Sequence, residues 1–133
     1  MSATGPIRVM LVDDHAGFRR LVAAVVDREA GMEVVAQAGS MGEARARIDS
    51  GGCDVAVLDM GLPDGVGSDL IAGLREVCPG SAVLVLSASL DTANVARAKE
   101  AGADELMDKF VDPREVVGAI RRLGVGRPPP ATP

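Results

Sequence analysis

Asp59 is the residue around which chemistry can be built, because it follows a buried run and precedes a turn. The four apolar residues Val55–Leu58 are too few for a helix and fit a strand covered on both faces, as in parallel sheets. Pro63, Asp64 and Gly65 then give a turn signal and are interpreted as turn chemistry. In open α/β sheets, ligands bind where such strands end. We therefore predict that Asp59 is a chemical centre.

Three further strand-like runs end in residues of complementary chemistry. The first ends at Asp13 and Asp14, another ends at Ser87, and a weaker one leads to Lys109. Parallel strands would bring these groups to one rim together with Asp59. Three carboxylates cannot lie close together without a compensating cation. Mg²⁺ suits them, because it takes oxygen ligands and leaves positions open for phosphate oxygens.

Such a rim could carry phosphoryl transfer to a carboxylate. With Mg²⁺ in place, Asp59 can attack a phosphoryl group and become an acyl phosphate. The metal and Lys109 would neutralise the phosphoryl oxygens, and the Ser87 hydroxyl would donate to one of them. Taken singly, Asp13 and Asp14 could cap a helix, Ser87 could begin a turn, and Lys109 could be a surface lysine. Because all of these residues fall at the ends of predicted strands, a shared functional site is favoured over these separate structural roles.

The elements that must position these residues alternate between strand and helix patterns. Strands are predicted at 7–12, 33–38, 55–59, 82–86 and 104–107, and helices at 18–25, 40–48, 70–77, 91–101 and 112–123. Ser40 with Glu43 forms a capping box, and Asp91 can cap the fourth helix. Strict alternation predicts an α/β fold, with a doubly wound parallel sheet of five strands and five helices on its two faces.

Length and composition set further bounds. The 133 residues predict one domain, and no apolar run approaches the ~18 residues of a membrane span. The net charge of −5 disfavours direct contact with nucleic acid. Cys53 and Cys78 are interpreted as reduced packing residues, and His15 lacks the companions of a zinc site. We expect a cytoplasmic domain, with residues 1–6 as a leader and 125–133 as a proline-rich tail or linker.

Four motifs in this order resemble the receiver domain of two-component response regulators. Val12–His15 resembles the acidic pair, and Leu58–Gly65 resembles the phosphoacceptor loop. Ser87–Ser89 resembles the hydroxyl switch, and Ala101–Asp104 followed by Lys109 resembles the fifth-strand lysine motif. The likeness is greatest to the subfamily with a C-terminal helix-turn-helix output domain.

The resemblance implies a flavodoxin-like sheet of strand order 2-1-3-4-5 within a receiver domain at 7–124. It makes Asp59 the phosphorylated nucleophile and Asp14 a direct ligand of Mg²⁺. Asp13 would hold the ion partly through water, and the Gly61 backbone carbonyl would complete the protein ligands. The phosphoryl donor would be a phosphohistidine on a sensor histidine kinase.

The resemblance also implies how the signal leaves the site. Ser87 and Lys109 would read the phosphoryl group and couple it to the face of the fourth helix, fifth strand and fifth helix, which could also form a homodimer. The domain would be a switch and no turnover enzyme. An alternative is a receiver-like interaction module that works without phosphorylation. It is motivated by Leu106, where the family usually has an aromatic residue, and by Phe110, where proline is common. We expect Phe110 to pack under the last helix rather than to be exposed.

Overall fold

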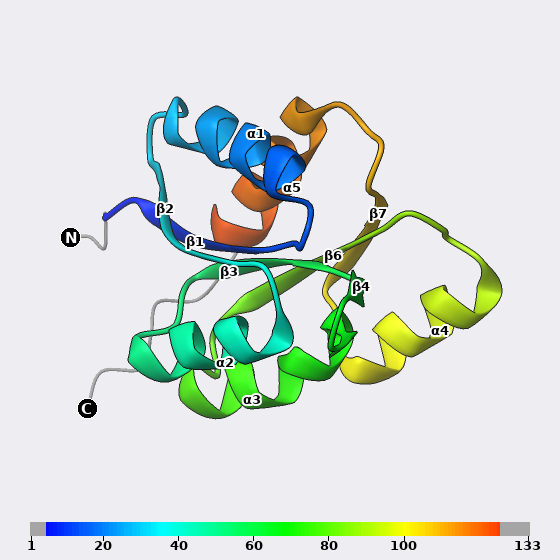
Figure 1. Ribbon diagram of the computed structural model, residues 1–133. Coiled ribbons are helices and arrows are strands. Elements are labelled where there is room, and N and C mark those ends of the chain that lie inside the picture. Colours follow the sequence, from blue (N-terminus) through cyan, green and yellow to red (C-terminus); the bar gives the residue numbers. More distant parts are fainter. Residues whose placement is uncertain (1–4, 126–133) are drawn as a thin grey trace.

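A five-stranded parallel sheet with helices on both faces forms the chain, as the computed structural model describes it for residues 5–125 (Figure 1). The sheet strands are β1 (Ile7–Val12), β2 (Met32–Ala38), β3 (Val55–Asp59), β6 (Ala82–Ser87) and β7 (Glu105–Asp108). The helices are α1 (Ala16–Asp27), α2 (Met41–Ser50), α3 (Ile71–Val77), α4 (Thr92–Ala101) and α5 (Pro113–Val125). The order β2-β1-β3-β6-β7 confirms the predicted order 2-1-3-4-5.

Strand β3 contributes to two hydrophobic cores, one on each face of the sheet. Val55 and Val57 pack with buried residues of α1 and α5. Ala56 and Leu58 pack with buried residues of α2, α3 and α4. Alternate side chains of a strand point to opposite faces, so a continuous apolar run is what a strand covered on both sides requires. Figure 1 shows α1 and α5 on one side of the sheet and α2 and α3 on the other.

The predicted helix boundaries rest on side-chain and glycine caps. Ser40 Oγ accepts a hydrogen bond of 3.1 Å from the backbone N–H of Glu43 at the start of α2. Asp91 Oδ1 accepts one of 2.8 Å from the backbone N–H of Asn94 at the start of α4. Gly102 ends α4 with a left-handed φ of 99°. Both predicted N-caps are confirmed.

A short hairpin follows Asp59 where only a turn was predicted. Its strands are β4 (Gly61–Leu62) and β5 (Gly65–Val66), which pair antiparallel and lead into the 3-10 helix η1 (Gly67–Leu70). The two residues between the strands, Pro63 and Asp64, have the turn chemistry that the sequence indicated. Strands of two residues carry too little alternation to be predicted from pattern.

The expectation that Phe110 packs under the last helix is wrong, because this side chain is 78% exposed. Lys109 before it is buried, and the chain then turns, with the Phe110 N–H donating to Asp108 Oδ1 at 2.8 Å. In this turn after β7, the Lys109 side chain is buried and the Phe110 side chain faces outward. Leu106 is half-buried and packs against the core on the α2, α3 and α4 face.

Two of the predicted boundary regions extend beyond what the structure describes. Residues 1–4 of the predicted leader and 126–133 of the predicted tail lie outside the described residues. Helix α5 ends at Val125, one residue into the predicted tail. Within 5–125, no helix has the length and apolar character needed to cross a membrane.

The two cysteines differ in their expected reactivity. Both are free, but Cys53 is buried, and burial raises the pKa of its thiol to about 12. Near neutral pH almost none of it is thiolate, the form that reacts with alkylating agents. We expect iodoacetamide to leave Cys53 unmodified in the folded protein, to label it after unfolding in urea, and to label half-buried Cys78 first, as read by peptide mass spectrometry. Equal labelling of Cys53 with and without urea would contradict this.

Candidate functional site

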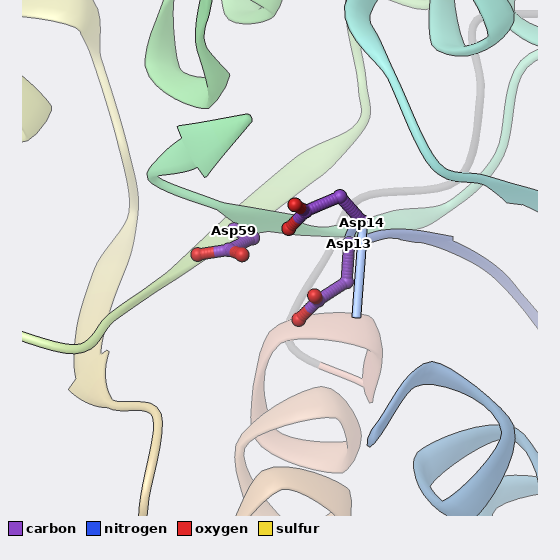
Figure 2. A group of neighbouring side chains, drawn as sticks. All are labelled: Asp13, Asp14 and Asp59. Carbon is purple, nitrogen blue, oxygen red and sulfur yellow. The ribbon is translucent and has the colours of Figure 1, made fainter. Parts of the chain in front are cut away.

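Three carboxylates meet at the carboxyl edge of the sheet. Asp59 ends β3, and Asp13 and Asp14 directly follow β1, which is the neighbour of β3 in the sheet. Each offers one oxygen, and these oxygens lie within 4.8 Å of one another (Figure 2). Asp13 and Asp59 are buried, whereas Asp14 is exposed. The structure thus brings together the acidic residues that the sequence placed on one rim.

Lys109 lies between the two buried carboxylates. Its Nζ donates to Asp59 Oδ2 at 2.9 Å and to Asp13 Oδ1 at 3.0 Å. It lies 3.0 Å from Asp13 Oδ2 as well, but outside hydrogen-bond geometry, and that buried oxygen accepts no hydrogen bond from the part of the chain that the structure describes. The predicted ammonium is in place, and it leaves one buried acceptor unsatisfied.

The electrostatics of the site favour additional positive charge. Burial raises the pKa of the Asp59 carboxyl, although its hydrogen bond from Lys109 works in the opposite direction. Burial alone would lower the pKa of Lys109, but its hydrogen bonds to Asp59 and Asp13 outweigh this and raise it. Both shifts favour the proton-bound form, as expected where two buried carboxylates share one ammonium group.

The donor set fits a hard divalent cation such as Mg²⁺. Asp13, Asp14 and Asp59 supply oxygen ligands, and buried Asp13 Oδ2, which accepts no hydrogen bond within residues 5–125, has lone pairs that a cation would take up. Asp59 Oδ1 accepts only a long hydrogen bond, 3.3 Å, from the backbone N–H of Gly61. Gly61 therefore lies next to Asp59 through its N–H, and the role predicted for its carbonyl stays a prediction.

Ser87 is buried at the end of β6 and lines a cavity that Asp14, Asp59 and Lys109 also line. Its hydroxyl donates to the Ser89 carbonyl at 2.6 Å and accepts from the Ser89 N–H at 3.2 Å. In this structure the hydroxyl is thus part of the local turn, which is the plainer of the two interpretations of Ser87 drawn from sequence. The cavity measures about 570 Å³, enough for a phosphoryl group and part of its donor.

Several neighbours of the site were not predicted from sequence. The Phe18 ring lies 5.1 Å from Lys109 Nζ in a cation–π contact, and Arg19 Nη1 donates to the Asp13 carbonyl at 2.6 Å. Both lie in the first turn of α1, and their closeness in sequence to Asp13 and Asp14 could have indicated that they lie near the site. Arg97 of α4 lines the cavity, but nothing in the sequence around this exposed helix residue indicates that it does.

Comparison with known proteins agrees with this arrangement. Residues 9–121 match the family model described as the response regulator receiver domain. The "DNA-binding transcriptional activator DevR/DosR" of Mycobacterium tuberculosis is 36% identical over 121 residues, which are 91% of this chain and 56% of that protein. The chain thus spans little more than half the length of this relative.

Two further comparisons extend over most of both chains. The "Chemotaxis protein CheY" of Thermotoga maritima is 31% identical over 116 residues, 87% of this chain and 96% of that protein. The crystal structure of a two-component response regulator of the LuxR family from an Aurantimonas species superposes with a TM-score of 0.82 at 32% identity. It covers 92% of this chain and 88% of that one. The likeness to regulators of transcription supports the predicted subfamily, and this chain belongs to the family of response regulator receiver domains.

Proposed function

We propose that this chain is a phosphorylation-dependent signalling switch in which Asp59 accepts a phosphoryl group from a phosphohistidine of a sensor histidine kinase. The observation that carries the proposal is the buried Asp59 carboxylate, held at 2.9 Å by Lys109 and lining an open cavity. In the transfer, a bond forms between an Asp59 oxygen and phosphorus while the bond from phosphorus to the imidazole nitrogen breaks. The leaving imidazole takes up a proton.

In this proposal Asp13, Asp14, Asp59 and the Gly61 carbonyl hold Mg²⁺, which supplies positive charge to the phosphoryl oxygens when it is bound. Lys109 adds a second positive charge that is already in the site. It holds Asp59 in position before transfer and can neutralise a phosphoryl oxygen afterwards. The raised pKa values of Asp59 and Lys109 support a site in which additional positive charge is favourable.

Ser87 would report the phosphoryl group to the surface. To donate to a phosphoryl oxygen, its hydroxyl must give up the 2.6 Å hydrogen bond to the Ser89 carbonyl. That carbonyl also accepts from Asn94 Nδ2 of α4 at 3.0 Å. Rearrangement of Ser87 would therefore reach α4, and from there the face of α4, β7 and α5 that we propose as the partner or homodimer surface.

The proposed partners follow from the family and from charge. Receiver domains are typically not enzymes in their own right, and we propose that this one catalyses only its own phosphorylation and dephosphorylation, in the cytoplasm. One relative is by its name a DNA-binding transcriptional activator and is longer than this chain. We therefore propose that the domain at 7–124 acts on an output domain, while the net charge of −5 of the whole chain keeps it off nucleic acid.

Phosphorylation of the wild-type chain by a small phosphodonor tests the proposal. Acetyl phosphate with Mg²⁺ should add one phosphoryl group, seen by intact-protein mass spectrometry, and peptide mapping should place it on Asp59. Beryllofluoride with Mg²⁺ should shift the amide resonances of Gly61 and Ser87. A chain that stays unmodified and unshifted would instead be the receiver-like interaction module that works without phosphorylation, for which exposed Phe110 offers apolar contact area.

A further inference from the structure

Asp64, interpreted from sequence as a turn residue, makes two hydrogen bonds to a distant helix. Its Oδ1 accepts from the Met41 N–H at 2.8 Å and its Oδ2 from the Gly42 N–H at 3.2 Å. Both amides belong to the first turn of α2, where backbone N–H groups lack helical partners. The hydrogen bond from Met41 is the main reason that the pKa of Asp64 lies below its usual range, so the carboxylate stays charged.

Asp64 lies at the tip of the hairpin that follows Asp59. Gly61 pairs with Val66 and Leu62 with Gly65, so the two strands have only two residues each. Gly61 is at the other end of the hairpin, where its N–H donates to Asp59 Oδ1. A hairpin this short cannot tilt at its tip without moving its base.

Packing leaves little freedom at either end of the hairpin. A Cβ atom on Gly65 would lie 3.0 Å from Met41 Cγ, and Met41 is itself buried in the core. Next to the base, a Cβ on Gly67 would clash with the Asp59 carbonyl oxygen, which no side chain could tolerate. The hairpin is therefore in close contact with α2 at its tip and with Asp59 at its base.

We propose that Asp64 is a positioning residue for the metal site, because its carboxylate anchors the hairpin to α2 and thereby holds Gly61, whose N–H donates to Asp59 Oδ1, next to Asp59. The inference rests on the proposed function, in which the Gly61 carbonyl is a metal ligand. A ligand from a backbone carbonyl cannot adjust by changing a rotamer, so its position depends on what holds the loop. The Asp64 carboxylate accepts two hydrogen bonds from the first turn of α2, one on each oxygen.

Isothermal titration calorimetry with Mg²⁺ alone, without a phosphodonor, tests this on the full chain. Asp64→Ala should weaken Mg²⁺ binding about tenfold, as loss of a group that orients a metal ligand typically does. Asp64→Asn keeps one acceptor oxygen and should lose less. The matched control is Glu43→Ala, which removes a different acceptor at the start of α2, the 2.6 Å bond from the Gly39 N–H. That variant should destabilise α2 but bind Mg²⁺ like the wild type.

The possible results distinguish a failure of the positioning role of Asp64 from a failure of the proposed function. Equal Mg²⁺ affinity in the wild type and Asp64→Ala, or equal losses in Asp64→Ala and Glu43→Ala, would overturn the positioning role while leaving the metal site intact. A wild-type chain that binds no Mg²⁺ would overturn the proposed function, and the inference with it. Circular dichroism shows whether Asp64→Ala is folded, and if it is not, Asp64→Asn against Glu43→Ala decides.

Discussion

Asp59→Asn should abolish phosphorylation by acetyl phosphate while the chain stays folded. An amide is a poor nucleophile and cannot form the acyl phosphate, so we expect the rate to fall by at least about 10³-fold, in keeping with the loss of a nucleophile in other enzymes. The measurement is the fraction of modified protein over time, by intact-protein mass spectrometry. Addition of Mg²⁺ should also raise the melting temperature of this variant less than that of the wild type.

The same substitution should not lower stability at neutral pH. Because folding raises the pKa of Asp59, the protonated form is favoured in the folded state. The ionised form therefore costs stability as the pH rises through and above its ordinary value of 3.8. An uncharged amide removes this cost. Asp49→Asn, an exposed position on α2, is the matched control. Wild-type phosphorylation of Asp59→Asn would place the acceptor elsewhere, with Asp13 the first residue to examine.

Lys109→Met should impair both stability and phosphoryl transfer. Lys109 is 8% exposed, and its ammonium group donates hydrogen bonds to Asp59 and Asp13. Without it, two buried carboxylates face each other unpaired, and we expect unfolding in urea to require about 3 kcal/mol less free energy. The loss of a positive charge beside the phosphoryl oxygens should slow transfer on the order of 100-fold.

Mg²⁺ separates the two effects of Lys109→Met. A bound cation would replace part of the missing positive charge, so Mg²⁺ should restore stability more in this variant than in the wild type. It should not restore the rate, because the ammonium group that contacts the phosphoryl oxygens is still missing. Lys99→Met on the exposed side of α4 is the control. A Lys109→Met chain with the stability and rate of the wild type would show that the ion pairs of Lys109 contribute to neither stability nor phosphoryl transfer.

The sheet and the acidic rim could be predicted because each rests on a local signal. Val55–Leu58 has no polar residue and is too short for a helix, which fits a strand buried on both faces, and the residue after such a strand lies at the ligand-binding edge. Once Asp13 and Asp59 were assigned to strand ends, their place at one edge followed from the topology of parallel sheets, and the strand order implied by the family resemblance made their strands neighbours. Lys109 followed in the same way.

The remaining features depend on contacts between distant segments, which local pattern does not encode. Asp64 reads as a turn residue, and nothing within a few positions of it indicates that the first turn of α2 supplies its partners. The outward direction of Phe110 depends on the inward direction of Lys109, which is a tertiary contact. The Ser87 hydroxyl donates to the Ser89 carbonyl, and sequence alone does not determine the rotamer that makes this hydrogen bond.

The packing of β3 on both of its faces limits how this domain can rearrange when Asp59 is phosphorylated. Val55 and Val57 are packed on one side of the sheet, and Ala56 and Leu58 on the other, so sliding or tilting the strand would open voids in both layers at once. The scaffold beneath Asp59 should therefore stay rigid while the connecting segments at its edge rearrange. Amide hydrogen exchange should be equally slow in β3 of the unmodified and phosphorylated forms and should differ in the segments after β6 and β7.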